Sequence, residues 1–322
     1  MSEEGRIDPH VHCRDWGESY KSTIREVFSL ARSQGVSIIF DMPNTEPPIT
    51  NRELVERRLR TAAEQGVKKG YYLYVAATRR LDQLEEAVRT VEEEPRVVGL
   101  KMYTAQMKGI EVENPEDQLR VYRALADMGY KGVIAVHCEK TSLFKTEKWS
   151  PNTPSSWNLA RPPESEVEAV RDQINAARSS GFRGTLHIVH VSTPGTIELI
   201  SRARQSGVRV VCGVTPHHLM MSTRDMEGPN GLLLKVNPPL REPEDTHGLL
   251  EALRRGEIDF IETDHAPHTL QEKLNPPYLS GIRSLEKYSQ LISWLVENGF
   301  PEKLIDDLTN RNIVRTFGVE PP

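Results

Sequence analysis

Short apolar runs rich in β-branched residues alternate with amphipathic stretches along the whole sequence, and this alternation constrains the fold more than any other feature. Strands are predicted at 6–12, 36–42, 71–77, 97–103, 132–137, 185–191, 208–215 and 258–264. Helices are predicted at 20–34, 52–65, 81–93, 115–128, 164–179, 194–205, 243–254 and 285–297, and glycines follow several of them, as helix ends prefer. Eight strands, each followed by a helix, indicate an α/β fold of the (β/α)8 barrel type.

The alternative fold is an open, doubly wound sheet. It is disfavoured because no Gly-x-Gly-x-x-Gly turn follows the first predicted strand. The chain has 322 residues, and a barrel of this kind typically needs about 250. We therefore expect residues 1–322 to form a single barrel domain.

Composition excludes several classes of function. A formal net charge of −5 and a pI near 6.1 argue against general nucleic-acid binding, and no apolar run approaches the ~18 residues of a membrane span. The first residues lack an apolar signal core. The three cysteines, Cys13, Cys138 and Cys212, are far apart, so we expect buried structural thiols in a cytoplasmic protein.

Residues of metal-binding type lie at or near the carboxyl ends of five predicted strands. His10 and His12 are two residues apart, so they point to the same side of the first strand. The other strands supply Lys101, His137, His190 and Asp264. Each is a weak signal alone, since a single strand histidine is more often a hydrogen-bonded core residue. All carboxyl ends of barrel strands surround one mouth, so the full set predicts a metal centre there.

Lys101 is the least ordinary member of this set, because it lies in a strand predicted to be buried. Burying an unpaired lysine costs several kcal/mol or forces the amine neutral. A neutral amine can react with CO2 to give a carbamate, an anion able to bridge two cations.

Several segments together resemble the dihydroorotases of the amidohydrolase superfamily. They are, in order, DPHVHCRD, MPNTEPP, GLKMY, VHCE, ARPPESE, HIVHVS, TPHHL, VNPPLR and TDHAPHT, and the resemblance runs from about residue 6 to the final NIVRTFG. It implies a centre of two zinc ions. His10, His12 and Asp264 would hold one ion and His137 and His190 the other, with carboxylated Lys101 and a hydroxide bridging them.

The resemblance also implies a reaction, the reversible hydrolysis of dihydroorotate to N-carbamoyl-L-aspartate in pyrimidine biosynthesis. Metal-bound water supplies the nucleophile in such centres, and Asp264 would act as the acid–base group for the ring nitrogen. By resemblance, Arg14, Asn44 and His268 would bind the substrate carboxylate, and Asn237 would lie beside the pyrimidine ring.

Two other functions stay open. The chain could be another cyclic amidohydrolase, such as a hydantoinase, dihydropyrimidinase or allantoinase, or a non-catalytic assembly subunit for aspartate transcarbamoylase. The expected partner is a small-molecule substrate, with neither nucleic acid nor membrane, and a homodimer or a complex with aspartate transcarbamoylase is compatible with the sequence.

The chain departs from the family pattern in three places. It begins at the first strand and stops soon after the last helix, so the small β-sandwich of many relatives should be absent or vestigial. Arg283 and Ser284 replace a Pro-Gly pair whose backbone normally contacts the ring. Gly213 replaces a glutamate found in many relatives, which speaks against a third metal. No expected ligand is missing, and this favours an active enzyme.

Overall fold

Eight parallel strands, hydrogen-bonded in the order β1 to β8, form the centre of the computed structural model, which describes residues 5–321. The strands are β1 (Arg6–Val11), β2 (Val36–Asp41), β3 (Tyr71–Ala76), β4 (Val97–Tyr103), β5 (Val133–His137), β6 (Thr185–Ile188), β7 (Val210–Val214) and β8 (Phe260–Ile261). Each lies within the range predicted from the sequence. The (β/α)8 barrel is therefore confirmed.

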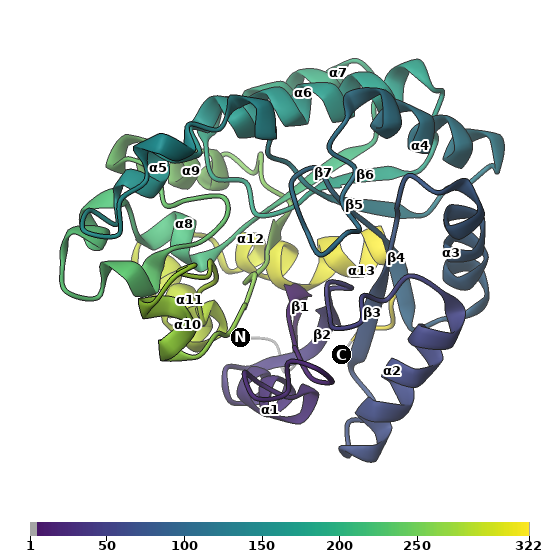
Figure 1. Cartoon of the computed structure of the whole chain (residues 1–322), viewed down its shortest axis with the longest axis horizontal. Helices are drawn as coiled ribbons and strands as arrows, with labels where there is room; N and C mark the ends of the chain where they lie inside the picture. Colours follow the sequence, from purple (N-terminus) through teal and green to yellow (C-terminus); the bar gives the residue numbers. More distant parts are fainter. Residues whose placement is uncertain (1–4, 322) are drawn as a thin grey trace.

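Helices follow the strands and form the outer layer of the barrel, as Figure 1 shows. One long helix succeeds each strand: α1 (Ile24–Ser33), α2 (Arg52–Glu64), α3 (Leu81–Glu93), α4 (Pro115–Asp127), α6 (Pro163–Ser179), α7 (Pro194–Gln205), α9 (Pro243–Arg254) and α11 (Tyr288–Glu297). Short helices fill the connections and the C-terminal segment: α5 (Ser156–Ala160), α8 (Pro216–Met220), α10 (Leu270–Leu274), α12 (Glu302–Asp306) and α13 (Asn312–Phe317).

The first and last strands meet through side chains and a short bridge rather than through a long ladder. The backbone N–H of His12 donates to the carbonyl of His265 at 2.8 Å. Asp8, at the start of β1, accepts from the backbone N–H and the hydroxyl of Thr263 at 3.0 and 2.6 Å. These contacts close the barrel at the point where the chain turns from β8 toward the mouth.

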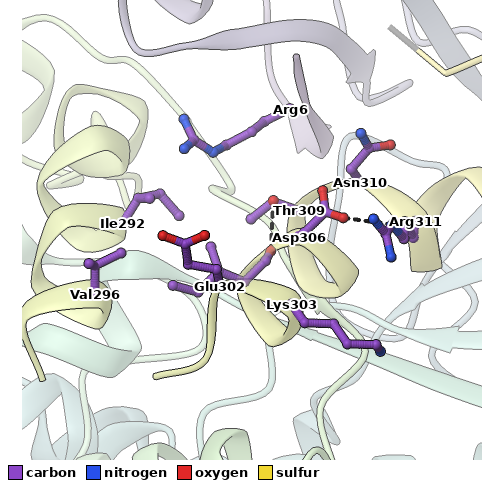
Figure 2. Close-up of a pocket in the computed structure, with 10 residues that line it drawn as sticks. Arg6, Ile292, Val296, Glu302, Lys303, Asp306, Thr309, Asn310 and Arg311 are labelled. Atoms are coloured by element: carbon purple, nitrogen blue, oxygen red, sulfur yellow. Dashed lines mark hydrogen bonds and ion pairs between the residues drawn. The ribbon is translucent and has the colours of Figure 1, made fainter. Parts of the chain in front are cut away.

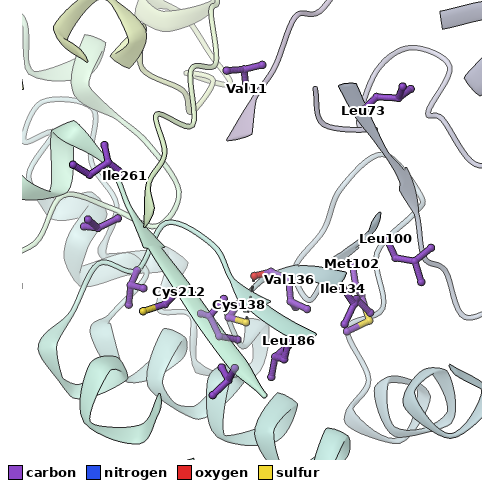
Figure 3. Close-up of a cluster of buried hydrophobic side chains, with 14 of the residues drawn as sticks. Val11, Leu73, Leu100, Met102, Ile134, Val136, Cys138, Leu186, Cys212 and Ile261 are labelled. Atoms are coloured by element: carbon purple, nitrogen blue, oxygen red, sulfur yellow. Dashed lines mark hydrogen bonds between the residues drawn. The ribbon is translucent and has the colours of Figure 1, made fainter. Parts of the chain in front are cut away.

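The core consists of two layers that follow the period-two alternation of the strands. Side chains on one face of each strand, such as Leu100, Ile134 and Leu186, point outward and pack against the helices (Figure 3). Cys13, Cys138 and Cys212 belong to this outward layer and are buried and free, as predicted. The other face points into the barrel, where apolar residues fill the amino-terminal end.

The last helices close that amino-terminal end. Figure 1 shows α12 and α13, in yellow, crossing the middle of the view beside the strands. Ile313 and Phe317 of α13 pack with Phe40 and Phe260 from inside the barrel.

Three predicted boundaries were wrong, and local backbone geometry explains two of them. β6 ends at Ile188 and β8 at Ile261, short of the predicted ends at 191 and 264. His190 and Asp264 have φ angles of 40° and 48°, a left-handed conformation that cannot continue a strand. The helix predicted at 20–34 begins only at Ile24, because Thr23 and Glu26 form a capping box that fixes its first turn.

Among residues 5–321, no helix has the length and apolar character needed to cross a membrane. The described residues contain one sheet, the eight-stranded barrel. Residues 1–4, part of the segment predicted to lack a signal core, and residue 322 lie outside the described residues. A single domain over residues 1–322 stays a prediction.

Candidate metal centre

Three predicted ligands converge at the carboxyl end of the barrel. One ligand atom each from His10, His12 and Asp264 lies within 4.8 Å of the others, and all three residues are buried. Asp264 Oδ1 is 3.3 Å from His10 Nε2 and 2.9 Å from His12 Nε2. Burial, followed by the charge of nearby Lys101, keeps the pKa of His10 well below its usual value. His10 is therefore a neutral imidazole with a lone pair to offer, and this cluster is consistent with metal binding.

A second pair of histidines lies beside this cluster, on β5 and just beyond β6. His137 Nδ1 and His190 Nε2 are 3.0 Å apart, and the rings of His190 and His10 are 5.2 Å apart. Glu139 Oε2 lies 2.9 Å from His137 Nε2 and accepts a hydrogen bond from Nε2–H, so the neutral ring carries its lone pair on Nδ1. A lone pair facing His190 at this distance requires a proton or a cation between the two rings.

Lys101 lies on β4, which pairs with β5, the strand that carries His137. Its side chain is fully buried, and Nζ has no hydrogen-bond partner among the described residues. Burial lowers the pKa of Lys101 to about 8. Its charge is among the causes that lower the pKa values of His10, His137 and His190. Its Nζ lies 5.0 Å from the centre of the Tyr103 ring, and a buried amine without a hydrogen bond fits a group that is modified or bound to a cation.

The backbone at two of these positions is held in an unfavourable conformation. Non-glycine residues rarely adopt positive φ, yet His190 and Asp264 both do. Such conformations cost of order 1–3 kcal/mol each and persist where surrounding contacts enforce them, often at functional sites. Here they turn both side chains toward the centre of the mouth.

Arg14 and His268 form the edge of the same mouth. Arg14 Nη2 lies 3.0 Å from His268 Nε2, and Arg14 Nε donates to the carbonyl of Pro267 at 3.1 Å. Burial, and then the charge of Arg14, hold the pKa of His268 well below its usual value. Neutral His268 therefore accepts from Arg14 through Nε2.

The structure places Asn44 and Asn237 at the mouth, each with a protein partner. Asn44 Oδ1 lies 2.8 Å from His12 Nδ1, so this amide orients a predicted metal ligand. Asn237 Oδ1 accepts from the indole of Trp157 at 2.9 Å. Lys235 lies next to it, with Nζ 3.8 Å from the centre of the Trp157 ring.

One cavity of about 630 Å³ joins these groups. Every site residue predicted from the sequence lines it except Lys101, which lies beneath: the lining includes His10, His12, Arg14, Asn44, His137, His190, Asn237, Asp264 and His268. A separate cavity of about 220 Å³ lies at the opposite end of the barrel, beside Arg6, Glu302 and Asp306 (Figure 2). Its lining contains no histidine or cysteine, and it does not touch the predicted ligands.

Several buried polar residues around the centre were missed in the sequence. Glu139 bridges His137 and Arg161, whose guanidinium donates through Nε to Glu139 Oε1 at 3.0 Å. Glu262 lies two residues before Asp264 and contacts the histidines from below. Both carboxylates are two residues from a predicted ligand, and this spacing was the available signal.

Comparison with known proteins decides the family. A dihydroorotase from Thermococcus kodakarensis is 33% identical, in an alignment that covers 98% of this chain and 68% of that protein. A dihydroorotase from Brevibacillus brevis is 30% identical, covering 100% of this chain and 73% of that protein. This chain belongs to the dihydroorotase family of cyclic amidohydrolases. No protein-family model matches it.

Solved structures agree with the family on the fold. L-hydantoinase from Arthrobacter aurescens superimposes with a TM-score of 0.87 at 24% identity, covering 98% of this chain and 71% of that chain. Dihydropyrimidinase from Brevibacillus agri superimposes with a TM-score of 0.82 at 23% identity, covering 98% and 71%. At these identities the likeness shows the shared barrel fold alone and says nothing of the substrate.

Proposed function

We propose that this member of the family is an active, metal-dependent dihydroorotase, which hydrolyses dihydroorotate to N-carbamoyl-L-aspartate and closes the ring in the reverse direction. Dihydroorotate differs from dihydrouracil by a carboxylate. The choice among cyclic amides therefore depends on whether the mouth can bind an anion next to the reacting amide.

The observation that carries this proposal is the state of Arg14. Arg14 is 6% exposed and lines the cavity beside the ligand cluster. No carboxylate in the described part of the chain lies within ion-pair distance of it. A buried cation without a counter-ion is costly, and a substrate carboxylate would supply the missing charge through paired hydrogen bonds. A hydantoin or dihydropyrimidine ring has no group for this position.

The donors around the mouth fit two zinc ions. His10, His12 and Asp264 would hold one and His137 and His190 the other, with a carbamate on Lys101 shared between them. The unpartnered Lys101 amine and the facing nitrogens of His137 and His190 support this assignment. Bound zinc would lower the pKa of water and polarise the scissile carbonyl.

Asp264 would be the acid–base group that transfers the proton. Its contacts with His10 and His12 both use Oδ1, which leaves Oδ2 to take a proton from the attacking water. The same carboxylate would deliver that proton to the leaving amide nitrogen. Arg14, with Asn44 and His268, would hold the substrate carboxylate and so fix the ring over Asp264, while Asn237 would contact the ring. The substrate is a small molecule, and buried free cysteines are in keeping with a cytoplasmic setting.

The test is turnover of four rings by zinc-loaded protein: dihydroorotate, dihydrouracil, hydantoin and allantoin. We expect hydrolysis of dihydroorotate alone, abolished by a chelator. Arg14→Met should raise KM for dihydroorotate by about 10–100-fold, as expected for a charged hydrogen bond of ~1.5–3 kcal/mol, with unchanged zinc content. Arg25→Met, at an exposed arginine outside the cavity, is the matched control.

Equal turnover of a ring without a carboxylate would favour a hydantoinase, dihydropyrimidinase or allantoinase. Folded protein that binds no metal and turns over none of the rings would instead favour an assembly subunit, for example with aspartate transcarbamoylase.

A further inference from the structure

Glu262 is a buried carboxylate inside the barrel, below the predicted ligands. It is 0% exposed and lies beyond the end of β8, two residues before Asp264. It is not part of the lining of the large cavity, so a bound substrate would not touch it. The reaction described above gives it no role.

Its two oxygens lie against residues of two strands, β6 and β1. Oε1 accepts the backbone N–H of His190, just beyond β6. Oε2 lies 3.2 Å from His187 Nε2 on β6 and 3.9 Å from His10 Nδ1 on β1. One carboxylate thus joins the backbone of one predicted ligand to the ring of another.

Gly213 of β7 provides the space for this carboxylate. A Cβ atom at position 213 would lie 2.3 Å from both Cδ and Oε1 of Glu262, closer than non-bonded atoms approach. Position 213 and Glu262 therefore compete for one volume inside the barrel. The bare glycine backbone lets the carboxylate from the β8 side occupy it.

The neighbouring histidines show what such an oxygen does. His12 has Asn44 Oδ1 2.8 Å from its Nδ1, and His137 has Glu139 Oε2 2.9 Å from its Nε2. In each case the nitrogen away from the centre meets a side-chain oxygen, and the other nitrogen faces inward. Outer partners of this kind fix the orientation of ligand histidines and raise their basicity. His10 Nδ1 has no hydrogen-bond partner in residues 5–321, and Glu262 is the carboxylate next to it.

We propose that Glu262 is a positioning residue of the metal centre, which orients His10 through Nδ1 and His190 through its backbone N–H. The inference rests on the metal centre of the proposed function. The carboxylate would accept a hydrogen bond from Nδ1–H of His10, so that the lone pair of Nε2 faces Asp264 and the ion. His187, whose function the sequence did not indicate, would hold the same oxygen from the other side. Gly213 is part of the arrangement because any side chain there would displace the carboxylate.

The first experiment measures zinc affinity by competition with a chromophoric chelator, together with urea unfolding of the metal-free protein. Glu262→Gln keeps the volume and removes the anionic acceptor. We expect zinc affinity to fall by about 10–100-fold, the usual effect of removing an outer partner of a ligand. Glu166→Gln is the matched control, since Glu166 is also buried but contacts Ser192 and Thr196 instead. Glu166→Gln should change the free energy of unfolding and leave the zinc affinity unchanged.

The second experiment separates a specific effect on zinc binding from a general loss of folding. Gly213→Ala should weaken zinc binding when Glu262 is present, because the new methyl group displaces the carboxylate. In a Glu262→Ala background the same substitution should have little further effect on zinc affinity.

Three results would overturn the proposal. A wild-type zinc affinity in Glu262→Gln would contradict the role of Glu262 and leave the metal centre standing. Equal effects of Gly213→Ala in both backgrounds would show that the two positions are not coupled through the carboxylate. A wild-type protein that binds no zinc would overturn the metal centre itself, and this inference with it.

Discussion

At the scale of single residues, the chemical form of the Lys101 amine is the property that its surroundings most affect. Its amine is fully buried and has no hydrogen-bond partner among the described residues, and its charge contributes to the lowered pKa values of His10, His137 and His190. An ordinary ammonium group among metal ligands would repel the cations. A carbamate at the same nitrogen reverses the sign of the charge and adds two oxygen donors.

The zinc content of the reconstituted protein should therefore depend on CO2. Metal-free protein supplied with zinc and bicarbonate should take up two ions per chain. Protein reconstituted in CO2-depleted buffer, or carrying Lys101→Met, should retain only the site of His10, His12 and Asp264. Metal analysis after gel filtration measures this, with Lys145→Met at an exposed position as the control. Full zinc uptake by Lys101→Met would contradict the assignment of Lys101 as a ligand.

The sequence predicted which residues gather at the mouth but not all of their partners. His10 and His12 could be paired from period two, and His137 and His190 from the rule that strand ends share one mouth. The spacing of Glu262 from Asp264 marked it as a candidate, but its contacts could not be predicted, because they depend on Gly213 leaving space in the neighbouring strand. Asn44 was expected to bind substrate, and in the structure its Oδ1 contacts His12. Such choices depend on side-chain orientation, which alternation does not specify.

At the scale of elements, a buried lysine of the helix α10 holds two backbone carbonyls near the mouth. Lys273 is 4% exposed and donates to the carbonyls of Lys235 and Gly281 at 2.8 and 2.7 Å. Burial, and then the charge of Lys235, lower the pKa of Lys273 to about 7. No carboxylate in residues 5–321 forms an ion pair with it, so the ammonium form is costly in this position.

The free energy of unfolding should therefore contain a term that rises with pH. An unfolded lysine has a pKa near 10.4, so between pH ~7 and ~10 the unfolded chain binds more protons than the folded chain. Below pH 7 both states are protonated, and the full cost of burial is present. The unfolding free energy of the wild type relative to Lys273→Met should thus increase from pH 7 to pH 9. Urea unfolding at both pH values measures it.

The control for this pH term is Lys303→Met, because Lys303 is 78% exposed on the side chain and pairs with Asp307. Its difference from the wild type should not change between pH 7 and pH 9. A constant difference for Lys273→Met as well would contradict a lowered pKa at Lys273.

The order and type of the elements could be predicted from alternation alone, since a parallel barrel needs apolar strands covered by helices on the outside. The ends of β6 and β8 could not be predicted in this way. There the chain leaves extended geometry at His190 and Asp264, and nothing in the local composition signals a positive φ. These misplaced ends coincide with predicted ligands, where contacts across the mouth override the local preference of the chain.

At the scale of the whole molecule, the two ends of the barrel differ, because one is open to a cavity and the other is packed with side chains. The carboxyl end holds the cavity and the predicted ligands. The amino end is filled by side chains and covered by α13, whose Phe317 ring lies 5.1 Å from Phe40, 6.2 Å from Tyr74 and 5.9 Å from Phe260 between centroids. Phe317 also lies 5.9 Å from His187, which contacts Glu262. The C-terminal segment therefore packs against the side chains that lie beneath the predicted ligands.

Phe317→Ala should lower stability more than it lowers catalysis. The ring is half-buried, so we expect a loss of about 2–3 kcal/mol in unfolding free energy, below the 3–5 of a fully buried phenylalanine. Phe317 does not line the cavity, so kcat at 25 °C should stay near the wild-type value. Val296→Ala, at a side chain 44% exposed, should change stability by less than ~0.5 kcal/mol. A stable Phe317→Ala protein would show that α13 contributes little to the barrel floor. A variant of normal zinc content but greatly reduced kcat would instead mean that the packing of this floor reaches the reacting groups.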